Sequence, residues 1–209
     1  MIVRRSIGGT IAVLAALFAG AAHADDRVAC FSPRPGEDMV AACTRLIDAG
    51  QLSSPALAVA LARLGASYNN AGDYDEAISV LAWTIEMQPD NGAAFDQLAA
   101  AYLAKEQYAR ALAMATEATR HSPNGAMAFA RRGQAWLHLR NFDEAIADYD
   151  RAIRLRPRFA AAYSGRAVAF ENKGDRARAL SDFQTALRLD PSSKTAAEGL
   201  LYLEQKRAR

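Results

Sequence analysis

Large and small apolar residues alternate along this chain at spacings of four and then three residues. Phe129, Gly133 and Trp136 form one such series, and Tyr163, Ala167 and Phe170 form another. These spacings place the three side chains of a series on one face of a helix. The small middle residue lets a second helix approach closely. The pattern therefore predicts an all-α chain of tightly packed helices.

The series recurs every 34 residues along the chain. Prolines mark the period, and each stands where one helix must end before the next begins: Pro89, Pro123, Pro157 and Pro191. A period of this length is typical of helical repeat arrays, which bind other proteins and seldom catalyse reactions. We divide this part of the chain into four repeats, 58–91, 92–125, 126–159 and 160–193.

The second half of the third repeat resembles a known family. Residues 141–146 read Asn-Phe-Asp-Glu-Ala-Ile, and residues 152–157 read Ala-Ile-Arg-Leu-Arg-Pro, which is similar to the second helix of the tetratricopeptide repeat. Four tandem copies in phase carry the resemblance, although Thr84 and Arg176 depart from it in the outer repeats. It implies a right-handed superhelical array of helix-turn-helix units that binds proteins.

The segments on either side of the repeats extend this array. Residues 25–57 form an N-terminal cap, in which Glu37 to Ile47 aligns with a second helix whose first helix is replaced by a tethered loop. Residues 194–209 continue the first-helix pattern and then become charged, which predicts a C-terminal capping helix. We expect about ten helices in all.

Residues 1–24 have the organisation of an export signal. Arg4 and Arg5 precede an apolar stretch, and Ala22-His23-Ala24 forms a small-x-small cleavage site. The alternative is a membrane anchor, but the apolar stretch is shorter than a spanning helix requires. We therefore expect a periplasmic or secreted protein with no membrane insertion after cleavage.

Both cysteines, Cys30 and Cys43, lie in the N-terminal cap. An even, close pair in an exported protein favours a disulfide. The alternatives are two free thiols, or a metal site that would need further ligands.

Charge and motifs argue against several functions. The chain has 25 basic and 23 acidic residues, and loss of the two leader arginines would leave the charge balanced. We take this as evidence against binding to nucleic acid or anionic lipid. We interpret His121 and His138 as solvated or helix-end histidines, and the sequence has no phosphate-binding glycine loop or nucleophile elbow. We predict that the protein is not an enzyme and holds no metal or cofactor.

In the resembled family, the first helices line a concave groove that holds the partner. The resemblance places the groove floor of the last three repeats at short, apolar and amide side chains, which we expect to be surface residues. The predicted partner site comprises Asp96, Ala100, Leu103, Met127, Ala130, Gln134, Leu137, His138, Ser164, Val168, Glu171 and Asn172. These residues include no lysine, which disfavours a carboxylate clamp. The alternative is that the small side chains serve the curvature of the array.

Two features break the repeat pattern. Leu64 and Leu98 are followed sixteen residues later by apolar residues, whereas Arg132 and Arg166 are followed by Asp148 and Asp182. We interpret the charged residues as ion pairs within one repeat, with anion binding by the arginines as the alternative.

Trp83 is the second exception, because the same position of the other repeats carries Glu117, Arg151 and Thr185. It is a candidate binding hot spot. Alternatively, it covers the N-terminal cap.

The sequence as a whole predicts an exported scaffold that binds a segment of an envelope protein in its groove. Two alternatives remain open. The protein could be an accessory subunit of an envelope enzyme or secretion complex, or a structural protein that self-associates by end-to-end stacking of repeats.

We predict that the mature protein begins at Asp25. The intact mass of protein isolated from the cell envelope should lack residues 1–24. Protein that retains these residues would show that the leader is not removed.

Overall fold

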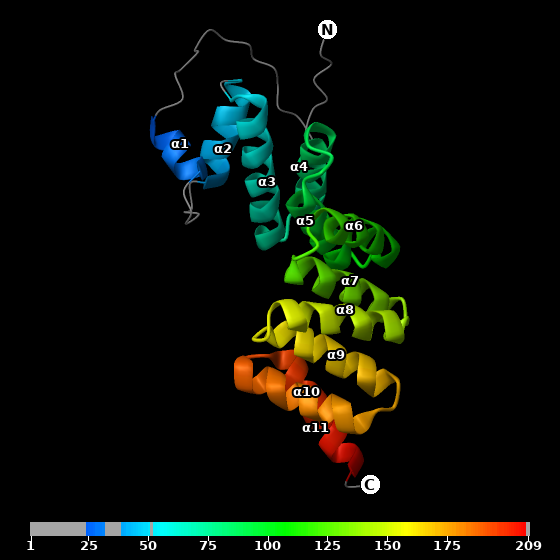
Figure 1. The fold of residues 1–209 in the computed structure, drawn as a ribbon. Helices are drawn as coiled ribbons and strands as arrows, with labels where there is room; N and C mark the ends of the chain where they lie inside the picture. The colour runs from blue at the N-terminus through cyan, green and yellow to red at the C-terminus, as the bar shows by residue number, and fades with distance from the viewer. Residues whose placement is uncertain (1–23, 32–38, 51, 208–209) are drawn as a thin grey trace. The chain divides into compact units, whose positions relative to one another are not determined.

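The computed structural model describes residues 24–31, 39–50 and 52–207, and all its regular structure is helical (Figure 1). The residues of the predicted leader before Ala24 lie outside the described residues. Among the residues that are described, no helix is long and apolar enough to cross a membrane. The prediction of an all-α chain is confirmed.

Helix pairs follow the 34-residue period. Within the described ranges the structure has eleven helices: α1 (Ala24–Phe31), α2 (Met39–Asp48), α3 (Ser54–Ala71), α4 (Tyr74–Met87), α5 (Gly92–Ala104), α6 (Tyr108–His121), α7 (Ala126–His138), α8 (Phe142–Leu155), α9 (Ala160–Asn172), α10 (Arg176–Leu189) and α11 (Lys194–Arg207). Each predicted repeat contains one pair, from α3–α4 to α9–α10. The expectation of a loop before α2 was wrong in part, because α1 forms there.

The turns within the pairs share an unusual backbone conformation. Gly72, Glu106, Arg140 and Gly174 occupy the same repeat position, and all four have positive φ angles between 57° and 88°. Glycine adopts this left-handed conformation without steric cost, whereas other residues are strained there. The repeated turn therefore depends on a backbone geometry that two of the four residues adopt at some cost.

The chain divides into two compact units, residues 1–101 and 102–209. In unit 1, the Cys30–Cys43 disulfide joins α1 to α2 and confirms the predicted pairing. Its two cysteines are fully buried with Ala42 and Leu46 in an apolar cluster, to which Ala60 of α3 also belongs. This cluster attaches the N-terminal helices to the first helix pair.

In unit 2, first and second helices alternate in contact. α8 packs against both α7 and α9, and α10 packs against both α9 and α11. The first helices α7, α9 and α11 also touch one another in series. Ala145, Ala152 and Ala179 of the second helices are fully buried at these contacts. On the first helices α7 and α9, Met127, Gln134, His138 and Asn172 remain exposed.

Two glycines in the first helices receive aromatic rings from the preceding repeat. A Cβ atom on Gly165 would overlap the ring of Tyr149, and one on Gly199 would overlap the ring of Phe183. Tyr149 and Phe183 occupy the same repeat position and are almost completely buried. The rings and glycines thus set how closely consecutive repeats approach.

We predict that reducing the disulfide loosens α1 and α2 while α7 to α10 keep their protection. A closed loop of this length contributes about 3 kcal/mol of stability in the chain-entropy model. Amide hydrogen exchange with and without reductant measures the effect helix by helix. Equal loosening throughout the chain, or no change in α1 and α2, would contradict this role.

Candidate protein-binding surface

The predicted groove residues of unit 2 differ in their exposure. Met127, Gln134, His138 and Asn172 are exposed on α7 and α9. Leu103, Leu137, Val168 and Glu171 are half-buried. Because α7 and α9 are in contact, the exposed and half-buried side chains of these two helices can act as one surface. The first-helix surface is defined here by Met127, Gln134, His138, Val168, Glu171 and Asn172.

Two residues expected on that surface are buried. Ala130 is 9% exposed and belongs to the apolar cluster that contains Tyr149 and Phe159. Ser164 is 4% exposed, and its Oγ lies 3.4 Å from Oγ of Ser193. The prediction that they are surface residues was wrong, because the neighbouring repeats cover this position. A charged side chain at either residue would disturb the core.

The predicted groove residues of unit 1 lie on α5, where Asp96 and Ala100 are half-buried. On α3, Asn69 Nδ2 donates to the main-chain oxygen of Gln97 at 2.9 Å and to its Oε1 at 3.1 Å. The Asn69 amide therefore links α3 to α5.

Trp83 is half-buried on α4. The described members of the apolar cluster around the disulfide lie on α1, α2 and α3, apart from Leu52. Both interpretations of Trp83, as a binding hot spot and as a cover for the N-terminal cap, stay predictions.

Polar and aromatic groups give the first-helix surface its chemistry. The His138 ring stacks on Tyr108 with 4.2 Å between centroids and 3° between planes. Burial raises the pKa of Glu171, and the charge of Lys206 on α11 partly opposes this shift. Asn172 Nδ2 donates to the main-chain oxygen of Val168 at 2.8 Å. The surface thus offers an aromatic edge, amides and a partly desolvated carboxylate.

Arginine–aspartate pairs join the two helices of the third and fourth repeats, as predicted. Arg132 Nε and one terminal nitrogen donate to the two carboxylate oxygens of Asp148 at 2.8 and 2.7 Å. Its other terminal nitrogen donates to Oγ1 of Thr119 at 2.8 Å. The hydrogen bond to Asp148 raises the pKa of Arg132.

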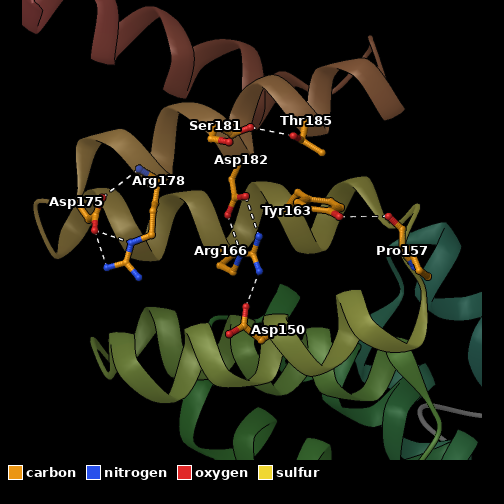
Figure 2. A network of polar contacts seen from close by, with 9 residues as sticks. All are labelled: Asp150, Pro157, Tyr163, Arg166, Asp175, Arg178, Ser181, Asp182 and Thr185. Atoms are coloured by element: carbon orange, nitrogen blue, oxygen red, sulfur yellow. Dashed lines mark hydrogen bonds and ion pairs between the residues drawn. The ribbon is translucent and has the colours of Figure 1, made fainter.

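Arg166 extends this arrangement across three helices (Figure 2). It donates to both carboxylate oxygens of Asp182 on α10, at 2.7 and 2.8 Å, and to Asp150 on α8 at 2.5 Å. These bonds, foremost the one to Asp182, raise its pKa. Both arginines therefore direct their guanidinium donors to partners within the protein, which favours a structural role over anion binding.

Sequence reasoning missed Thr119 and Asp150 as partners of these arginines. The two residues stand at different repeat positions, so the 34-residue period could not pair them with an arginine. Within the residues that the structure describes, no group of three or more His, Cys, Asp or Glu side chains could hold a metal ion.

Comparison with known proteins supports the resemblance of this sequence to the tetratricopeptide repeat. The tetratricopeptide repeat family model matches residues 97–158 and 139–194. The comparison with curated proteins found no significant match. The family match therefore covers all but the first residues of the second repeat, and the two repeats that follow it.

Solved structures give the same result for the fold. The Arabidopsis OM64 TPR domain is 27% identical, covers 55% of this chain and 94% of its own, and has a TM-score of 0.53. The crystal structure of MamA is 24% identical over 73% of this chain and 87% of its own, with a TM-score of 0.62. The first TPR of Spaghetti (RPAP3), solved with an HSP90 peptide, is 23% identical over 56% and 94%, with a TM-score of 0.53.

These matches support membership of the tetratricopeptide repeat family. Repeats of this family generally mediate binding between proteins, and the fold is typical of non-enzymatic scaffolds.

We predict that Arg132→Leu destabilises the protein by about 3 kcal/mol, because it leaves the Asp148 carboxylate buried without its partner. The double variant R132L/D148V should cost less, since it introduces the residue types that the first repeat carries at Leu64 and Val80. Denaturant unfolding of both variants makes the comparison. A double variant as unstable as the sum of the two single changes would contradict the pairing.

Proposed function

We propose that this protein is an exported scaffold that binds a segment of another envelope protein along the first-helix surface of unit 2. The observation that carries the proposal is the exposure of Met127, Gln134, His138 and Asn172 on two first helices in contact. In the same repeats, Arg132 and Arg166 are held in ion pairs within the protein.

The chemistry of the surface suits an extended segment. Amides such as Gln134 and Asn172 can bond a peptide backbone, while Met127 and Val168 offer apolar contact. The HSP90 peptide in the Spaghetti (RPAP3) structure supports peptide binding on this fold. The predicted groove residues contain no lysine, so recognition would depend on side chains and backbone within the segment rather than on a terminal carboxylate.

Support for export comes from the N-terminal region. Disulfides persist in oxidising compartments, and the Cys30–Cys43 disulfide is fully buried in the core of unit 1. The predicted leader precedes it directly. The partner would therefore meet the protein outside the reducing cytoplasm.

The test compares two glutamines that are both exposed, Gln134 on α7 and Gln184 on α10. A photo-reactive residue at position 134 should crosslink the partner in intact cells, and mass spectrometry would identify it. Gln134→Arg should then weaken binding of that purified partner at least tenfold without changing the melting temperature. Gln184→Arg, on a second helix, is the matched control and should bind as the parent does.

Two results would contradict the proposal. Crosslinks from position 184 but not from position 134 would move the site to the second helices. Full binding by Gln134→Arg would exclude the first-helix surface.

A further inference from the structure

The two units carry opposite charge. Residues 1–101 contain 6 basic and 11 acidic side chains, a net charge of −5, whereas residues 102–209 contain 19 and 12, a net charge of +7. The near balance of the whole chain therefore conceals a strong asymmetry, which indicates electrostatic interaction with a partner. Because each unit is charged, the balanced net charge of the whole chain does not exclude a charged partner.

The asymmetry is sharpest at one position of the repeat, in the last turn of the second helix. Glu86 of α4 stands where α6, α8 and α10 carry an arginine, and all four side chains are exposed. Four residues later, Asp90 stands where the third repeat carries Arg158. The arginines at the repeat position of Glu86 are Arg120, Arg154 and Arg188.

Helix electrostatics explain the arginines but not Glu86. The C-terminal end of a helix carries partial negative charge, which favours a basic side chain and disfavours an acidic one. The last turn of α4 contains no basic residue, and Glu86 adds a negative charge there. An acidic group at this position costs stability within the helix, so a gain elsewhere would account for it.

The basic counterpart is concentrated at the end of α8. Arg154, Arg156 and Arg158 are all exposed within five residues of chain. The Arg156 guanidinium lies over the Phe159 ring, 4.9 Å from its centre, in a cation–π contact. Arg151 donates to the main-chain oxygen of Pro123 at 3.5 Å, so the end of α8 lies beside the turn after α6.

These charges are available for binding. In the described part of the chain, no ion pair involves Arg154, Arg156, Arg158, Glu86 or Asp90.

We propose that a second copy of this chain binds here, with the acidic patch of one copy, Glu86 and Asp90, against the basic patch of the other, Arg154, Arg156 and Arg158. Nucleic acid or an anionic lipid surface would attract unit 2 but repel unit 1. A second copy offers each unit a patch of opposite charge, because each chain carries both patches. The two patches lie at the ends of α4 and α8 and in the turns after them, and none of their residues belongs to the first-helix surface.

Sedimentation velocity of the full mature protein tests the proposal. In 50 mM NaCl the protein should associate, and in 500 mM NaCl the dissociation constant should rise by about tenfold or more, because salt screens exposed charges. A protein that stays monomeric in 50 mM NaCl at high micromolar concentration would overturn the proposal. Association of equal strength in both salt concentrations would also overturn it.

Charge reversal identifies the two patches. The triple variant R154E/R156E/R158E and the double variant E86K/D90K should each be monomeric in 50 mM NaCl, while an equimolar mixture should form a mixed complex. R110E, a reversal of another exposed arginine in unit 2, is the control and should associate like the parent. Circular dichroism confirms that each variant is folded.

If the folded variants still self-associate, or if their mixture stays monomeric, the patches are not the interface. Gln134→Arg should leave self-association unchanged, so failure of this inference is distinguishable from failure of the proposed function.

Discussion

Close contact between helices over alanine and glycine is the constraint on which the second unit depends. Ala145, Ala152 and Ala179 are fully buried, so each second helix can seat between two first helices. Gly165 has the same effect in a first helix, because the Tyr149 ring fills the space that a side chain would need. Consecutive first helices are thereby brought into contact, and the binding surface that we propose is a consequence of this packing.

Polar contacts add specificity to packing that is otherwise made of small side chains. Where the first two repeats use apolar residues, the third and fourth use Arg132 with Asp148 and Arg166 with Asp182. The bond from Arg166 to Asp150 also ties α9 to the preceding repeat (Figure 2). Buried ion pairs contribute little net stability because both charges lose water. We therefore expect them chiefly to specify which helices pair.

The sequence was most informative where one repeat could be compared with another. Helix pairs and the Arg132–Asp148 contact follow from the 34-residue period, and the disulfide follows from an isolated cysteine pair. Burial of Ala130 and Ser164 could not be predicted in this way, since it depends on how closely the next repeat approaches. Helix α1 was missed because it belongs to no repeat. The groove residues therefore needed the structure to separate exposed groups from core.

Hydrogen exchange on the complex with the crosslinked partner tests the central claim most directly. If a protein segment binds along the first-helix surface, peptides from α7 and α9 should exchange more slowly in the complex. Peptides from α8 and α10 should exchange as they do in the free protein. Protection confined to α8 and α10, with α7 and α9 unchanged, would contradict the account.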